Sequence, residues 1–290
     1  MINKHLKEGD ELQMNDDKSL SLGKAETIYK QSTHIPSKVQ ADTLFNFTTE
    51  LKFLITSIKN SMLSPRYNEE NIEYLKIDGI KRIAVPMKCF CDINMHRLEE
   101  HLIWYGYYGL AFSKEWGMRN KVQPIQYINQ DSFLSHDFSN TFSAALKINH
   151  SMQTQEQKLM KSFLLHQLMY YKPYSGNIEN RNTKETCEKC FTDECEWRFI
   201  PQVSKAGFKQ IFYDENIFNA GVLNDLSNSM DGVSEISLNF EYNDIKYVIV
   251  KTMSDFKELT EVITSLEIEQ EEKYGLISKI IIWENSRGDF

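Results

Sequence analysis

Residues 81–93 read KRIAVPMKCFCDI, and residues 105–117 read YGYYGLAFSKEWG. The first run predicts extended chain, interrupted at Pro86 because proline lacks the N–H donor and is confined to sheet edges and bulges. Between the two runs, residues 96–105 predict a helix that Gly106 ends. A strand over residues 107–113, a short helical turn over 114–118 and a strand over 124–128 are expected next.

Outside this stretch, two helices are well marked. Residues 42–47 alternate as a short strand does, and a helix follows with apolar residues on one face: Leu51, Leu54, Ile55, Ile58 and Met62. Thr48 or Thr49 is suited to cap this helix, and Ser64-Pro65 should end it. The helix over 154–171 opens with Thr154 and Gln157 in capping-box spacing.

The remaining chain predicts the following elements in order: a surface loop over residues 172–193, a short strand over 196–200, a hairpin of strands 234–241 and 245–252, a helix capped by Ser254, and a strand over 277–283. The fold class is α+β, with a mixed, mostly antiparallel sheet and flanking helices. Residues 1–38 are a polar N-terminal extension with six basic and six acidic residues, and residues 42–290 form one domain.

Composition excludes several classes of protein. The 290 residues are 41% hydrophobic and 12% aromatic, which is typical of a folded chain. A net charge of −8, from 33 basic and 41 acidic residues, makes nonspecific nucleic-acid binding unexpected. No apolar run approaches the roughly 20 residues of a membrane helix, and no signal peptide is recognisable. Five cysteines, an odd number, favour reduced thiols and a cytoplasmic location.

The cysteines do not predict a metal site. Cys187, Cys190 and Cys195 supply three thiolates locally, whereas structural zinc takes four ligands, so no metal is expected. Cys89 and Cys91 are expected on one face of a strand as small core residues. The chain lacks the Walker, dinucleotide-glycine, HExxH and GxSxG motifs, which excludes the commonest ATPases, Rossmann enzymes and hydrolases.

Several strings resemble the AbiGi family, bacterial proteins associated with abortive phage resistance and described as antitoxins. These strings are PMKCFCDIN at 86–94, His101, YGYYGLAFSKEWG at 105–117 and PIQYI at 124–128. The resemblance continues through residues 44–58, DECEWRFIP at 193–201 and the final SKIIIWENSRGDF. It implies a role in phage defence with a toxin or another defence component as protein partner, and it leaves self-association open.

The order of elements also resembles that of ADP-ribosyltransferases, which implies NAD as a cofactor. By that resemblance, Asn46 and Thr48 would anchor NAD, and Tyr105 and Tyr108 would stack on nicotinamide. Glu196, or else Glu194, would then be the catalytic acid. Transferases of the relevant kind commonly place a histidine in the first motif, where this chain has Asn46.

Strand alternation predicts that Glu194, Glu196 and Arg198 share one face. In the functional interpretation, a cleft carboxylate stabilises an oxocarbenium-like centre as nicotinamide leaves, and Arg198 holds pyrophosphate or fixes the carboxylate. In the alternative interpretation, this is a solvated strand face whose ion pair contributes less than ~1 kcal/mol.

Aromatic and histidine residues offer further candidates. Tyr105 and Tyr108 lie at a glycine-rich corner, where they either sandwich a flat ring or pack in the core. His101 is expected to be the functional histidine because the resemblance includes it; its alternative role is a backbone contact at the sheet edge.

Two hypotheses therefore stand. The chain is an antitoxin or regulatory partner of a toxin, or it is an effector that transfers ADP-ribose or consumes NAD through Glu196. Asn46 in place of histidine favours the first, and the charged face of Glu196 and Arg198 favours the second. The net charge of −8 predicts a partner that is basic at the contact.

Overall fold

The computed structural model describes residues 13–14, 20–21, 41–148, 153–179, 186–213 and 215–287. The chain divides into two compact units, residues 1–39 and 40–290. In the first unit the described residues form an antiparallel pair, β1 (Gln13–Met14) and β2 (Leu20–Ser21). The rest of the predicted polar extension lies outside the described residues.

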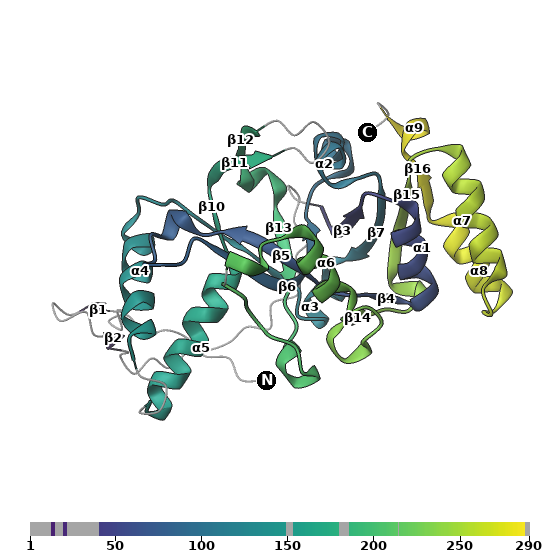
Figure 1. Ribbon diagram of the computed structural model, residues 1–290. Helices are drawn as coiled ribbons and strands as arrows, with labels where there is room; N and C mark the ends of the chain where they lie inside the picture. Colours follow the sequence, from purple (N-terminus) through teal and green to yellow (C-terminus); the bar gives the residue numbers. More distant parts are fainter. Residues whose placement is uncertain are drawn as a thin grey trace, which may run out of the picture. The chain divides into compact units, whose positions relative to one another are not determined.

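An eight-stranded sheet organises the second unit (Figure 1). The spatial order is β16 (Ile280–Ile282), β15 (Ile245–Val250), β7 (Tyr108–Ser113), β3 (Thr43–Thr48), β6 (Arg82–Cys91), β13 (Glu196–Phe199) and β8 (Gln123–Pro124), with β5 (Arg66–Asn71) also paired to β6. Only the β15–β16 pairing within this sheet is parallel. The predicted α+β class with a mostly antiparallel sheet is confirmed.

Strand β6 joins two halves of this sheet. Its first six residues pair with β5, and its last four pair with β13. The predicted interruption at Pro86 is wrong, because β6 runs through it. The backbone N–H of Ala84 donates to Phe212, so the Pro86 nitrogen two residues later faces the same edge. Pairing with β13 starts only at Lys88, and the missing donor therefore costs no ladder hydrogen bond with β13.

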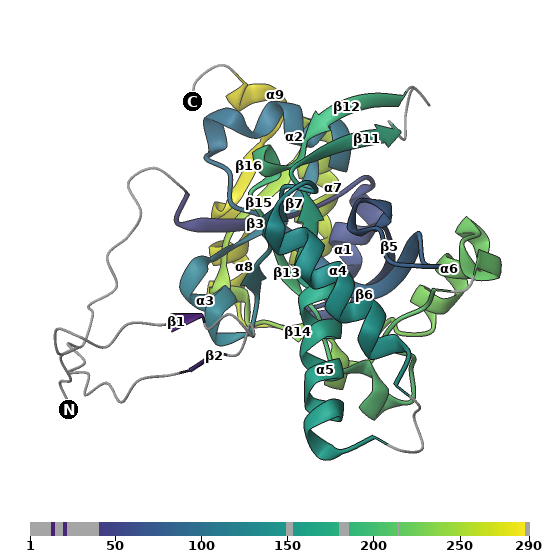
Figure 2. The same ribbon diagram turned by 90° about the vertical axis from the view of Figure 1, so that its left-hand side faces the viewer.

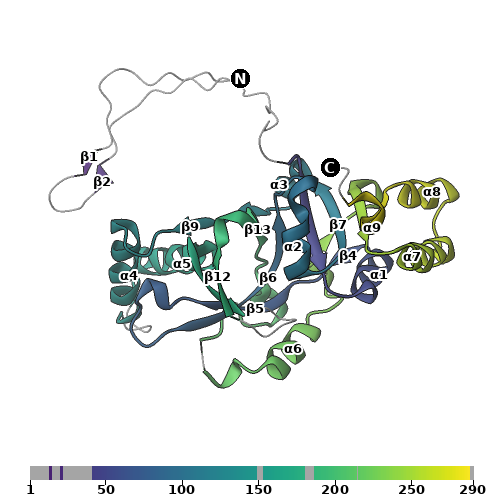
Figure 3. The same cartoon turned by 90° about the horizontal axis from the view of Figure 1, so that it is seen from above.

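Successive side chains along β3, β7 and β15 point to opposite faces of the sheet and pack into two separate cores. Leu44, Phe112 and Val248 pack with α1 (Leu51–Asn60), α3 (Lys114–Arg119), α7 (Met253–Ser265) and α8 (Gln270–Ser278). Their neighbours Phe45, Ala111 and Ile249 pack with α2 (Leu98–Tyr105) and α9 (Trp283–Ser286). Figure 3 shows α2 and the group α1, α7 and α8 on opposite sides of β3 and β7.

The half of the sheet around β5 is covered by other helices. One face packs against α4 (Phe133–Leu146) and α5 (Gln155–Tyr170), which lie side by side in Figure 2. A parallel pair, β9 (Gln126–Ile128) and β10 (Tyr171–Pro173), completes this side. The opposite face packs near α6 (Ala220–Asn228). No helix in the described part of the chain is long and apolar enough to cross a membrane.

Helix boundaries differ in detail from the predicted ones. The capping box of Thr154 and Gln157 begins α5 as predicted. Helix α1 follows Glu50 rather than a threonine cap, and it ends at Asn60 because Ser61 turns left-handed with φ 49°. Thr252, in a capping box with Asp255, replaces Ser254 as the cap of α7. The helix expected from residue 96 begins as a 3₁₀ turn, Met95–Arg97, before α2.

Two predictions about strands are wrong. The expected surface loop over 172–193 contains β10 and a hairpin of β11 (Ser175–Glu179) and β12 (Thr186–Cys190). The expected 234–252 hairpin does not form, because β14 (Leu238–Asn239) pairs with β4 (Met62–Leu63) while β15 inserts between β7 and β16. The apolar run Val248–Val250 in β15 suits a central strand covered on both faces. The last strand shortens to β16 because α8 runs to Ser278.

Candidate functional site

The DECEWRF string brings three charged side chains to one place. Glu194 lies in a 3₁₀ turn (Phe191–Glu194), and Cys195 then takes a left-handed φ of 43° before β13 begins at Glu196. Glu194 and Glu196 are both buried, as is Arg198. The interpretation as a solvated strand face is therefore wrong, and the predicted convergence of the three residues is observed.

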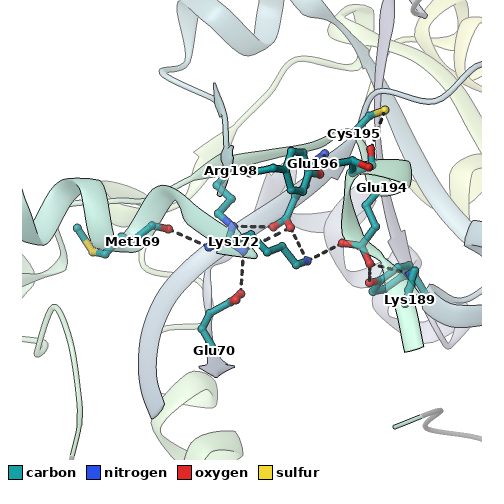
Figure 4. Close-up of polar contacts among 11 residues, drawn as sticks. Glu70, Met169, Lys172, Lys189, Glu194, Cys195, Glu196 and Arg198 are labelled. Carbon is teal, nitrogen blue, oxygen red and sulfur yellow. Dashed lines mark hydrogen bonds and ion pairs between the residues drawn. The ribbon is translucent and has the colours of Figure 1, made fainter. Parts of the chain in front are cut away.

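All three nitrogens of the Arg198 guanidinium donate hydrogen bonds inside the protein, where the side chain is 0% exposed. Its Nε donates to Glu196 Oε1 at 2.6 Å, and its Nη2 donates to Glu70 Oε1 at 2.8 Å. Its Nη1 donates to the carbonyl oxygen of Met169, at 2.8 Å. Arginine thus ties β13 to β5 and to the end of α5 through one rigid fork (Figure 4).

Two lysines complete the network. Lys172 of β10 places Nζ 2.5 Å from Glu194 Oε2 and 2.8 Å from Glu196 Oε2. Lys189 of β12 reaches Glu194 Oε1 at 2.7 Å, and the Tyr105 hydroxyl donates to the same oxygen at 2.5 Å. We call six charged residues the buried charge cluster: the buried Glu194, Glu196 and Arg198 and the half-buried Glu70, Lys172 and Lys189.

The buried charge cluster balances three carboxylates with three cations. Burial alone would raise the pKa of Glu196, but Arg198 and Lys172 hold that pKa well below its usual range. Burial likewise opposes the charge of Glu194, whose pKa is lowered by Lys172 and Lys189. For Glu70 burial prevails over Arg198, so its pKa is raised. Glu194 and Glu196 are thus held as ionised acceptors, a state unsuited to proton donation.

A second ion pair is also buried. Asp92 of the CFCDI string and Lys114 of the SKEWG string are 2.6 Å apart, and both are buried. Burial raises the pKa of Asp92, and Lys114 opposes that shift. The Lys114 ammonium also lies 5.9 Å from the ring centroid of Trp197. The strings that carry the resemblance are therefore joined to one another in the interior.

His101 adjoins the cluster as a neutral ring. Its ring centroid lies 4.5 Å from that of Tyr105 and 5.7 Å from that of Phe47. Burial lowers the pKa of His101 from 6.5 to about 4. The imidazole is therefore uncharged at neutral pH.

The remaining predicted site residues do not join this group through any described contact. Asn46 donates its side-chain amide to the carbonyl of Cys89 at 2.8 Å. The carbonyl of Thr48 faces Gly106, whose missing Cβ permits the approach. Tyr108 packs in the core of α1 and α7, where burial and Asp255 raise its pKa. Tyr105 instead contacts Glu194 and His101, so Tyr105 and Tyr108 do not flank one ring-shaped site.

The matches to known proteins cover the same stretches of sequence. Residues 58–251 match the family described as "Putative abortive phage resistance protein AbiGi, antitoxin". The abortive phage resistance protein AbiGi of Lactococcus lactis subsp. cremoris is 30% identical over 245 residues, covering 78% of this chain and 98% of that relative. The chain belongs to the AbiGi family. No solved structure matches it.

Every member of the buried charge cluster lies within the AbiGi match, as do Asp92 and Lys114. Sequence reasoning missed Glu70, Lys172 and Lys189. Lys172 and Lys189 fall in the segment interpreted as a loop, and Glu70 lies more than a hundred residues from its partner Arg198. The sequence of β5, RYNEEN, has Tyr67 as its single apolar residue, so no alternation marked Glu70 as part of a strand.

Two hollows of this AbiGi protein lie elsewhere. A hollow of about 830 Å³ lies over the turn between β5 and β6, and one of about 360 Å³ follows β9 and β10. Neither is lined by the buried charge cluster. Within the described ranges, no three His, Cys, Asp or Glu side chains are placed to hold a metal ion, and Cys187 is exposed on β12.

Proposed function

We propose that this AbiGi protein acts in abortive phage defence as an antitoxin that binds a protein toxin. One observation carries the proposal: Asp92 pairs with Lys114, and Glu196 with Arg198, inside the fold. Glu196 is 7% exposed, and both its oxygens accept hydrogen bonds from Arg198 and Lys172. Such a network has a structural role, so we expect the protein to bind its partner through its surface.

The alternative of ADP-ribose transfer needs a carboxylate that faces bound NAD. Neither cavity reaches Glu196, and Asn46, expected to anchor NAD, donates to Cys89 instead. The geometry favours the antitoxin over the effector.

The charge distribution indicates how a toxin would be bound. Residues 253–278, which include α7 and α8, contain seven acidic and two basic residues, or five of the eight net negative charges. Glu258, Glu261 and Glu271 on these helices are exposed. An acidic surface attracts a basic one and speeds encounter, so the toxin is basic where it meets α7 and α8.

Expression in bacteria tests the proposal. The chain alone should be tolerated, and it should rescue cells from the toxin encoded beside it. Replacing Glu258, Glu261 and Glu271 with lysine should weaken rescue and toxin binding, whereas Glu188→Lys on exposed β12 is the matched control. Growth arrest by the chain alone, with consumption of labelled NAD that Glu196→Ala abolishes, would establish the effector and overturn the proposal.

A further inference from the structure

Helix α5 is apolar on faces that nothing in the described chain covers. Leu164, Leu168 and Met169 point into the core, as expected for a surface helix. Leu159 is nevertheless 62% exposed and Phe163 60% exposed, where polar residues would normally stand.

These exposed side chains share one side of the helix. At 3.6 residues per turn, Leu159, Met160 and Phe163 fall within an arc of about 100°. We call these three residues the α5 apolar face. Glu156 shares the arc but lies in the first turn, at the end of the face.

Helix α4, which packs beside α5, adds further apolar surface (Figure 2). Its exposed members are Phe133, Leu134 and Leu146. Phe133 is 89% exposed, and these three side chains point in different directions around the α4 axis, so they flank the α5 apolar face without extending it as one surface. Exposed apolar side chains grouped on one helix face mark interaction sites, and the α5 apolar face is such a group.

We propose that a second copy of this chain covers the α5 apolar face. The low net charge of α4 and α5 favours a second copy over the toxin as the molecule that binds here. Residues 133–170 contain two acidic and three basic residues, in a chain of net charge −8. Two copies that meet here avoid apposing their acidic α7 and α8 helices, whereas a basic toxin gains nothing from this nearly neutral surface.

The geometry suits a two-fold interface. Two α5 helices packed antiparallel about an axis between Met160 and Phe163 place Phe163 of each copy against Leu159 and Met160 of the other. Glu156 then lies at the rim, where a charge remains solvated. An aromatic residue and methionine at the centre of such a patch match the composition of interface cores.

Sedimentation of the full chain tests the proposal independently of any toxin. The wild type should sediment as a dimer at micromolar concentration, both at low salt and in 1 M NaCl, because an apolar interface is insensitive to screening. Phe163→Glu and Leu159→Glu should each raise the dissociation constant of the dimer by about 10²- to 10³-fold, because each substitution is present in both copies at the interface. Leu165→Glu, on the opposite side of the same helix, should leave the dimer intact.

Circular dichroism identifies any variant that fails to fold, and the second of the two variants then serves as the test. A monomeric wild type at 100 μM would overturn the proposal, as would a folded Phe163→Glu protein that remains dimeric. If the wild type is monomeric and Phe163→Glu abolishes toxin binding, the face belongs to the toxin and not to a second copy. Failure of rescue with an intact dimer would count against the antitoxin function alone.

Discussion

At the scale of single residues, the buried charge cluster is stable because each charge has partners. Arg198 alone contacts Glu196, Glu70 and a backbone carbonyl. A buried ion pair need not stabilise more than an apolar pair would, but removing one partner leaves the other charge uncompensated. The cluster therefore makes the fold depend on residues that the sequence alone indicated as catalytic.

Glu196→Gln should consequently destabilise the protein. The amide keeps the shape of the side chain but leaves Arg198 and Lys172 with less negative charge in a buried site. We expect a loss of about 3–5 kcal/mol in the free energy of unfolding, measured by urea denaturation. Glu188→Gln, on an exposed strand position, is the control and should change little. Equal stability of the two variants would contradict a structural role for Glu196.

His101 should make stability depend on pH. Its pKa is about 4 in the folded chain and 6.5 ordinarily, so the unfolded state takes up a proton first as the pH falls. Stability is thus fully present above about pH 6.5 and is lost as the pH falls toward 4. Glu194 and Glu196, whose pKa values are lowered, change the stability only below about pH 4.5, the ordinary pKa of glutamate. Their effect therefore lies outside most of the pH range in which His101 acts.

The measurement is the free energy of unfolding at pH 7, 6 and 5 for the wild type and for His101→Gln. The wild type should lose more stability over this range than the variant. An NMR titration of the His101 ring should give a pKa near 4. A ring that titrates near 6.5 would show that the folded protein does not disfavour its charged form.

At the scale of elements, Gly106 sets how α2 passes into β7. It has a φ of 102°, and a Cβ placed there would lie 2.1 Å from the carbonyl oxygen of Thr48. Neither the conformation nor the space suits any other residue. The sequence predicted a helix end at Gly106 from local chemistry, but the close approach to β3 depends on the tertiary fold.

Gly106→Ala should therefore lower the melting temperature, with a loss of about 2–4 kcal/mol from backbone strain and the clash with β3. Gly275→Ala is the matched control, because Gly275 lies in α8 with nothing within 4 Å of the added Cβ. This control should be neutral or stabilise by up to ~1 kcal/mol. Similar melting of the two variants would contradict a tight approach at Gly106.

The elements that local sequence predicted well are those whose signals are local. Helix α5 carried its own capping box, and β3 its own alternation. The β11–β12 hairpin and the central place of β15 were missed because strand pairing depends on partners distant in sequence. The same limit applies to the site: alternation along β13 placed Glu196 and Arg198 on one face, whereas Glu194 reaches them through a 3₁₀ turn and Lys172 through the tertiary fold.

At the scale of the whole second unit, the first and second halves of the sequence are interleaved in one sheet. Strand β13 lies between β6 and β8, and β15 pairs with β7. Arg198 and Glu70 add an ion pair across the same division. This arrangement supports the expectation that residues 42–290 behave as one unit, although the helices divide into separate groups on the two ends of the sheet.

A protease site inserted between Ile148 and Gln153 tests this interleaving. Cleavage there separates β3, β6, β7 and β8 from β13, β15 and β16 in the covalent chain, yet each group lacks strands that the other supplies. We expect the two fragments to elute together in gel filtration under native conditions and to separate only in denaturant. Intact chain with the uncut insertion is the control. The opposite result would be two fragments that separate in native buffer, each with its own cooperative melting transition. That result would show two independent domains, because each half would then fold without the strands of the other.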